Sequence, residues 1–202
     1  CCQDKVYDFP AISQKPYFPI DLPRWSENLR IIDCGAYTGD TILSALENQY
    51  KIESCYCFEP DPGNFSKLVK TLKTIPNSYC WPCGVFSCNK TFKFSSGGDT
   101  GSSISHEGDI SIQCVALDDV IPNCSPNLIK FDIEGSEQAA LKGAKNLIRK
   151  YRPMMAISVY HLSTDIWKIP LYINSIIGPR AKYFLRKHSR SIADTVLYIY
   201  PD

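Results

Sequence analysis

The sequence has no marked excess of charge of either sign, since its 202 residues carry 22 basic and 21 acidic side chains. A charge balance this close to neutral gives no electrostatic reason to expect nucleic acid or an anionic membrane as a partner. No apolar run approaches the roughly 20 residues that a membrane helix needs. The first residues, CCQDKVYDFP, lack the apolar core of a signal peptide. We therefore expect neither nucleic acid nor a membrane among its partners.

A second CxxC pair is also missing, although the chain has ten cysteines. Cys80, Cys83 and Cys88 resemble part of a zinc site, but a structural zinc usually needs four ligands from two such pairs. CWPC also has the spacing of a redox pair, which should open a helix, yet a strand-like run follows it. Cysteines in apolar runs act as small buried hydrophobes. We expect reduced thiols, a cytoplasmic location and no metal, with a zinc or redox role of CWPC as an alternative.

Two regions differ in pattern. Residues 1–28 combine four prolines with scattered aromatics, which is typical of an irregular lead-in that packs on the core or docks another domain. The first residue is not methionine, so we regard the chain as a possible fragment whose additional domain is missing. From residue 29 apolar runs alternate with amphipathic stretches, and we place one domain at 29–202.

Strands that alternate with helices predict an α/β fold, with a mainly parallel sheet covered by helices on both faces. The helices are predicted at 40–50, 61–73, 136–151 and, interrupted by Pro170, 163–177. In the first helix Ile42, Leu43, Leu46 and Tyr50 form the apolar face, and Asp61 is a good N-cap for the second. The polar loop at 96–109 is either a lid or an ordinary loop.

Sheets of this kind bind ligands at the carboxyl ends of their strands. The first predicted strand ends in the pattern Asp33-x-Gly35-x-x-x-Gly39. Gly35 permits a tight turn and the close approach of a ligand. Gly39, Asp40 and Thr41 begin a helix, whose free amides favour an anion such as a pyrophosphate or a carboxylate. A turn that merely needs glycine explains the same pattern.

The next strand ends in Glu59, where a carboxylate can accept both hydroxyls of a ribose. A solvated acid before a helix is the alternative. A dinucleotide fingerprint, G-x-G-x-x-G, would need glycine at the position of Tyr37 to make room for the pyrophosphate. A methionine carboxylate needs less room, so the pattern favours S-adenosylmethionine over NAD.

A third group follows the apolar run LIKF. Asp132 ends that strand and Glu134 lies two residues on, so the pair can hold a substrate hydroxyl, a cationic cofactor or a metal. His161 is expected to end the next strand, where it can act as a general base or as a metal ligand. Solvated loop acids and a structural histidine are the alternative interpretations.

Together these segments resemble the FkbM family of S-adenosylmethionine-dependent methyltransferases. The matching segments are IIDCGAYTGDT, CFEPDPGNFSKLVKTL, VALDDVI, LIKFDIEGSEQAALKGA and DTVLYIYP. The resemblance implies a Rossmann-like class I methyltransferase fold, with a seven-stranded sheet whose last strand is antiparallel. It also implies S-adenosylmethionine as cofactor and methyl transfer to a hydroxyl of a sugar or another small molecule.

The resemblance assigns a role to each matching residue. The methionine part of the cofactor would be surrounded by Asp33, Gly35, Ala36, Tyr37, Gly39, Asp40 and Thr41, with Tyr37 standing where relatives often carry Asn. Glu59 would hold the ribose beside Pro60, and Gly84 and Val85 would form the adenine wall. Asp132 and Glu134 would lie near the methyl group, with His161 or Asp132 as the base.

Two other functions share parts of this pattern. An NAD-dependent oxidoreductase would also need the glycine turn and the ribose acid, and Tyr37 argues against it. A non-catalytic binding module could keep the cofactor fold as a scaffold, and the intact set of cofactor residues argues against that.

Overall fold

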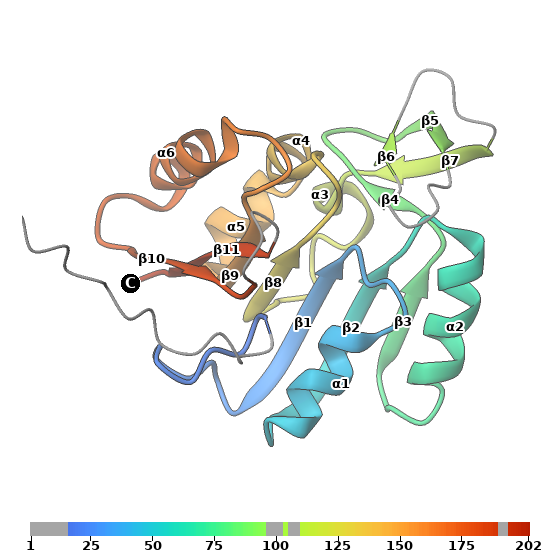
Figure 1. The fold of residues 1–202 in the computed structure, drawn as a ribbon, viewed down its shortest axis with the longest axis horizontal. Coiled ribbons are helices and arrows are strands. Elements are labelled where there is room, and N and C mark those ends of the chain that lie inside the picture. Colours follow the sequence, from blue (N-terminus) through green and yellow to red (C-terminus); the bar gives the residue numbers. More distant parts are fainter. Residues whose placement is uncertain (1–15, 96–102, 105–109, 190–193) are drawn as a thin grey trace, which may run out of the picture.

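A seven-stranded sheet forms the centre of the computed structural model, which describes residues 16–95, 103–104, 110–189 and 194–202. Its strands are ordered β10-β11-β9-β8-β1-β2-β3 (Figure 1). Their bounds are Asn28–Cys34 (β1), Lys51–Phe58 (β2), Ser78–Trp81 (β3), Leu128–Phe131 (β8), Met154–Ser158 (β9), Lys182–Lys187 (β10) and Thr195–Tyr200 (β11). Strand β11 pairs antiparallel with β9 and β10, and the other pairings are parallel. The predicted sheet with an antiparallel last strand is confirmed.

Helices cover both faces of this sheet, as Figure 1 shows. Their bounds are Asp40–Glu47 (α1), Pro62–Leu72 (α2), Leu117–Val120 (α3), Glu137–Gly143 (α4), Lys145–Tyr151 (α5) and Asp165–Ile177 (α6). Along β1, Ile32 and Cys34 pack in one core with α3–α6, whereas Leu29 and Ile31 pack in the other with α1 and α2. Side chains alternate along a strand, so an apolar β1 serves both cores. Among the described helices, none is long and apolar enough to cross a membrane.

A second, four-stranded sheet follows β3. Its strands are Gly84–Val85 (β4), Lys90–Ser95 (β5), Ser103–Ile104 (β6) and Ile110–Val115 (β7), in the order β4-β7-β5-β6. Gly84 pairs with Cys114, so this sheet begins directly beyond the end of β3. The sequence predicts strands in this region but not that they leave the main sheet. Most of the predicted loop at 96–109 lies outside the described residues.

The described part of the lead-in packs into the core on the α1 side. Tyr17, Phe18, Leu22 and Trp25 are all less than 9% exposed. The ring of Trp25 stacks on Tyr200 with centroids 4.9 Å apart. Residues 16–27 therefore bury apolar area against β11, although they form little regular structure.

Three elements differ from the sequence prediction. The helix predicted at 136–151 is two helices, α4 and α5, that meet at Ala144. Conversely, α6 continues through Pro170, because a proline in the second turn removes one hydrogen bond while Ile169 and Ile173 are fully buried. Strand β9 ends at Ser158, so His161 lies in the following loop and not at the last residue of the strand.

Candidate active site

The glycine turn after β1 lies directly against the end of β8. Gly35 has a φ of +81°, and its amide and that of Ala36 both donate to the carbonyl of Phe58 at 3.0 Å. A side chain at Gly35 would run into the backbone carbonyl of Asp132, so this close approach requires glycine. Gly39, with a φ of +90°, precedes α1 without a side-chain cap. The turn thus brings uncapped helix amides and the end of β8 to one edge of the sheet.

A buried carboxylate, Glu59, lies beside this turn at the end of β2. One of its oxygens accepts the Tyr37 N–H at 2.8 Å, and the other accepts the Asp61 N–H at 2.9 Å. Burial raises the pKa of Glu59 to about 7, although both amides favour the charged form. Each carboxylate oxygen can accept a further hydrogen bond. The group therefore has the acceptors that a ribose diol would need.

Gly84, part of the predicted adenine wall, lies next to Pro60, which follows Glu59. A side chain at Gly84 would lie 2.9 Å from Cys114 Sγ and 4.0 Å from Pro60 Cβ. Val85 is buried one residue further on. Tyr37 is 54% exposed, and its backbone has a φ of +47°. The structure therefore places Pro60 and Gly84 close together and leaves Tyr37 free to contact a ligand.

Of the other predicted cofactor residues, Asp40 is exposed, and three lie in the interior, namely Asp33, Ala36 and Thr41. Lys130 Nζ lies 3.1 Å from Asp33 Oδ1 and donates to the carbonyl of Gly35 at 2.5 Å. Burial raises the pKa of Asp33 to about 6, and the Lys130 ammonium limits that rise. Asp33 therefore supports the turn from beneath and is not brought to the surface.

Asp132, Glu134 and His161 meet at the ends of β8 and β9. His161 Nε2 lies 3.3 Å from Glu134 Oε2 and 3.7 Å from Asp132 Oδ1. Its Nδ1 lies 2.8 Å from Oε1 of Glu137, a fully buried carboxylate that also accepts the Ile133 N–H. The three predicted catalytic residues thus lie together, and His161 is oriented by a fourth residue, Glu137, that the sequence does not assign to the site.

The charges of this cluster depend on one another. Burial would lower the pKa of His161, but its hydrogen bond to Glu137 and the surrounding carboxylates raise it. Burial would raise the pKa of Asp132, but the Lys130 ammonium and the hydrogen bond from Tyr17 keep it below its usual range. The cluster therefore combines a stable carboxylate with an imidazole that binds a proton readily.

This geometry agrees with the comparisons to known proteins. The chain matches the methyltransferase FkbM domain over residues 33–188. The chain belongs to the FkbM methyltransferase family. It is 31% identical to a methyltransferase FkbM from Methylobacillus flagellatus KT, whose crystal structure superposes with a TM-score of 0.77 over 92% of this chain and 47% of that one. This FkbM chain therefore spans about half the length of that relative.

Two further relatives extend the comparison. The FkbM chain is 25% identical to the hexuronic acid methyltransferase AglP of Haloferax volcanii, over 70% of this chain and 71% of that protein. A Streptococcus pneumoniae protein solved in complex with S-adenosyl-L-methionine shares the fold, with a TM-score of 0.53 and 9% identity over 87% of this chain and 67% of that one. The fold is therefore that of Rossmann-like methyltransferases.

Four residues of the FkbM site are not assigned by the sequence analysis. They are Tyr17, Lys130, Glu137 and Tyr160, which contact Asp33, Asp132 or His161. A single lysine inside the apolar run LIKF was a usable signal for Lys130, and the second acid of EGSE was one for Glu137. Nothing in the local sequence connects Tyr17 with Asp132, which lies 115 positions away.

The donor atoms of Asp132, Glu137 and His161 lie within 4.8 Å of one another, a spacing that could hold a metal ion. In this arrangement, however, Glu137 Oε1 and His161 Nδ1 bond to each other, and Asp132 Oδ2 accepts the Tyr17 hydroxyl. We therefore interpret the cluster as a hydrogen-bonded network of acids and an imidazole.

The CWPC segment does not have the environment of a redox pair. Cys80 and Cys83 lie in β3 and in the turn after it, and not at the start of a helix. Burial raises the pKa of Cys83 to about 12, whereas a reactive thiol needs a lowered one. All cysteines within the described ranges are free thiols.

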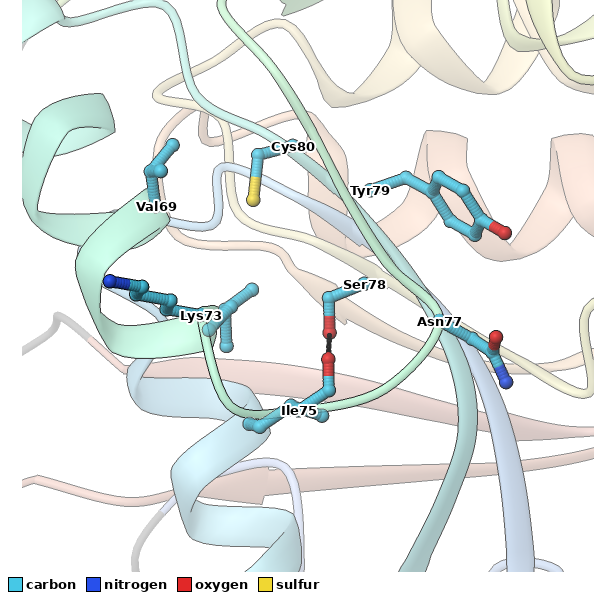
Figure 2. A pocket seen from close by; sticks show the side chains of 8 residues that line it. Val69, Lys73, Ile75, Asn77, Ser78, Tyr79 and Cys80 are labelled. Atoms are coloured by element: carbon cyan, nitrogen blue, oxygen red, sulfur yellow. Dashed lines mark hydrogen bonds between the residues drawn. The ribbon is translucent and has the colours of Figure 1, made fainter.

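A surface pocket lies away from this site, between α2 and the start of β3 (Figure 2). Its lining includes Val69, Lys73, Tyr79 and Cys80, and the Ser78 hydroxyl donates to the Ile75 carbonyl at 2.8 Å beside it. Because β3 begins here, the pocket lies at the amino end of the strand, whereas the glycine turn and the acidic cluster lie at carboxyl ends. It is therefore not the cofactor site.

Proposed function

We propose that this chain transfers a methyl group from S-adenosylmethionine to a hydroxyl group of a sugar or another small molecule. The observation that carries the proposal is the contact between Gly35 and the Asp132 carbonyl. This contact places the glycine turn, which suits a methionine carboxylate, beside the acidic cluster, which suits an acceptor hydroxyl. Donor and acceptor sites on one edge of the sheet are what a two-substrate transfer requires.

The residues present fit the cofactor in three places. The uncapped amides at the start of α1 would donate to the methionine carboxylate, and the Glu59 carboxylate would accept from the ribose hydroxyls. Pro60 and Gly84, which lie side by side, would form a wall for the adenine. S-Adenosylmethionine supplies an activated methyl group on a sulfonium. The protein therefore needs to align the acceptor and to remove its proton, without activating the donor.

One side chain of the cluster is proposed to receive that proton. His161 is oriented by the buried Glu137 and directs Nε2 toward Glu134 and Asp132. We propose that His161 Nε2, in its neutral form, takes the proton while Asp132 holds the hydroxyl. The carboxylate of Glu137 stabilises the imidazolium that results, and this arrangement is typical of general-base catalysis.

The acceptor class is inferred from the relative that methylates a hexuronic acid. Carbohydrates carry several hydroxyls of similar acidity, so a positioned base and an oriented carboxylate suit them. We propose a glycan or a small-molecule alcohol as the acceptor. The charge of the chain does not favour nucleic acid as the acceptor. This exclusion of nucleic acid remains a prediction from the composition.

The test is a methyl-transfer assay with a panel of acceptors. S-Adenosylhomocysteine release is followed with methyl hexopyranosides, hexuronic acids and simple alcohols, and products are identified by a mass increase of one methyl group. We expect one sugar class to be methylated by the intact chain and not by Asp132→Ala. An enzyme that keeps its turnover after Asp132→Ala would refute the proposed role of the cluster.

A further inference from the structure

Tyr17 enters the acidic cluster from a part of the chain that precedes the family match, which begins at residue 33. Its hydroxyl donates to Asp132 Oδ2 at 2.6 Å. We propose that Tyr17 is a positioning residue of the active site, which fixes one oxygen of Asp132 so that the other faces His161 and the acceptor. This inference rests on the role proposed for Asp132 above.

The contact is a short hydrogen bond from a buried ring to a partly buried, charged acceptor. Tyr17 is 7% exposed, and its ring also lies 5.2 Å from the Lys130 ammonium. Hydrogen bonds from a hydroxyl to a carboxylate are about twice as strong as neutral ones and are strongest away from water. With Oδ2 engaged in this way, Asp132 Oδ1 is the oxygen that lies 3.4 Å from the Tyr160 hydroxyl and 3.7 Å from His161 Nε2.

The backbone of Tyr17 is held in an unfavourable conformation to make this contact. Its φ is +76°, a value that bulky residues rarely adopt. Two hydrogen bonds hold it there, from the Tyr17 N–H to the Tyr198 hydroxyl at 2.9 Å and from the Trp25 indole to the Tyr17 carbonyl at 2.8 Å. Strain that the surroundings maintain is concentrated at functional sites.

The hydroxyl is the part of Tyr17 that a packing role does not explain. A phenylalanine would fill the same volume beside Leu29 and Ile31, which belong to the same core cluster. The groups that face Asp132, besides Tyr17, are Lys130, Glu134, Ser158, Tyr160 and His161. Within this network Tyr17 donates the shortest hydrogen bond to Asp132 that the structure shows.

The experiment compares Tyr17→Phe with Tyr200→Phe in the full chain. Tyr200 contacts the same segment, through a hydrogen bond from its hydroxyl to the Pro23 carbonyl at 2.7 Å, but it does not touch Asp132. Turnover is measured with the sugar that the acceptor panel identifies, and cofactor affinity with S-adenosylhomocysteine by calorimetry. Independently of any acceptor, the ionisation of Asp132 is followed by carbon NMR of aspartate-labelled protein, with Asp132→Asn for assignment.

We expect Tyr17→Phe to lower kcat roughly 10- to 100-fold, the size of one lost charge-assisted hydrogen bond. The Kd for S-adenosylhomocysteine should stay unchanged, and the pKa of Asp132 should rise. Tyr200→Phe should change none of these three quantities. An unchanged Asp132 pKa, an unchanged kcat, or an equal loss in Tyr200→Phe would each overturn the inference. If no sugar in the panel is methylated, the proposed acceptor class fails while the NMR result still decides the role of Tyr17.

Discussion

Glu59 is the single residue whose ionisation should be visible in cofactor binding. Its folded-state pKa of about 7 is raised above the unfolded value by burial, so folding disfavours the carboxylate. A ribose diol needs that carboxylate as acceptor. The affinity for S-adenosylhomocysteine should therefore increase as the pH rises from 6 to 8, and the same linkage predicts that the free protein loses stability as the pH rises toward 7.

Glu59→Gln should bind S-adenosylhomocysteine at least about tenfold more weakly, since a charged acceptor is lost, and its affinity should no longer vary between pH 6 and 8. Glu27→Gln is a suitable control, because Glu27 makes an exposed ion pair with Lys51 far from the turn. Calorimetry at three pH values measures both variants. A pH-dependent affinity that survives Glu59→Gln would assign the titration to another group.

His161 provides a second test at this scale, which needs no acceptor. Burial alone would lower the pKa of His161. The hydrogen bond to Glu137 outweighs that effect and raises the pKa above its ordinary value. Nitrogen NMR of the imidazole should therefore show a midpoint above about 6.5, the ordinary value for histidine. Glu137→Gln should lower that midpoint, whereas Glu47→Gln, on the surface of α1, should leave it unchanged. A midpoint that Glu137→Gln does not move would remove Glu137 as the orienting group.

At the scale of elements, the turn between β1 and α1 depends on glycine for two separable reasons. Gly35 has a positive φ and also packs against the Asp132 carbonyl, whereas Gly178 has a φ of +82° with no atom within 4 Å of an added side chain. Gly178→Ala should cost about 1–3 kcal/mol of unfolding free energy from strain alone. Gly35→Ala should cost more and should also abolish cofactor binding. Denaturant unfolding of both variants tests this, and equal costs would show that the contact with β8 contributes nothing.

The sequence predicts elements well where a pattern is local. The sequence predicts Asp61 as the N-cap of the second helix, and its side chain accepts the Asn64 N–H at 2.8 Å. The predicted apolar face of α1 is wrong for Leu43 and Leu46, which are 42% and 41% exposed, while Ile42 and Ala45 are fully buried. A helical periodicity fixes a stripe only to within one residue when small side chains such as alanine can also face the core.

Interactions between distant segments could not be predicted in the same way. The alternating strands and helices defined the edge where Asp132 and His161 meet, because strand ends of a parallel sheet share one edge. The second sheet and the contact of Tyr17 with Asp132 depend on tertiary packing that no local pattern records. Glu137 was visible only as a helix-start acid, since its partner His161 lies 24 positions away.

For the whole molecule, the division into a lead-in at 1–28 and a domain at 29–202 remains a prediction. The buried side chains of the lead-in suggest that they stabilise the fold. Trp25→Ala should lower the unfolding free energy by about 3–5 kcal/mol, as expected for a large buried ring. Ile20, in the same segment, is 82% exposed, so Ile20→Ala should change it by less than about 0.5 kcal/mol. Equal, small effects in thermal unfolding would support a lead-in that is separate from the domain.

The central claim is that the glycine turn, Glu59 and the acidic cluster form one methyl-transfer site for S-adenosylmethionine. The most direct measurement is calorimetric titration of the full chain with S-adenosylmethionine and, separately, with NADH. We predict one S-adenosylmethionine bound per chain, no heat with NADH, and a marked loss of affinity in Glu59→Ala. Binding of NADH in place of S-adenosylmethionine, or an affinity unchanged by Glu59→Ala, would contradict this assignment.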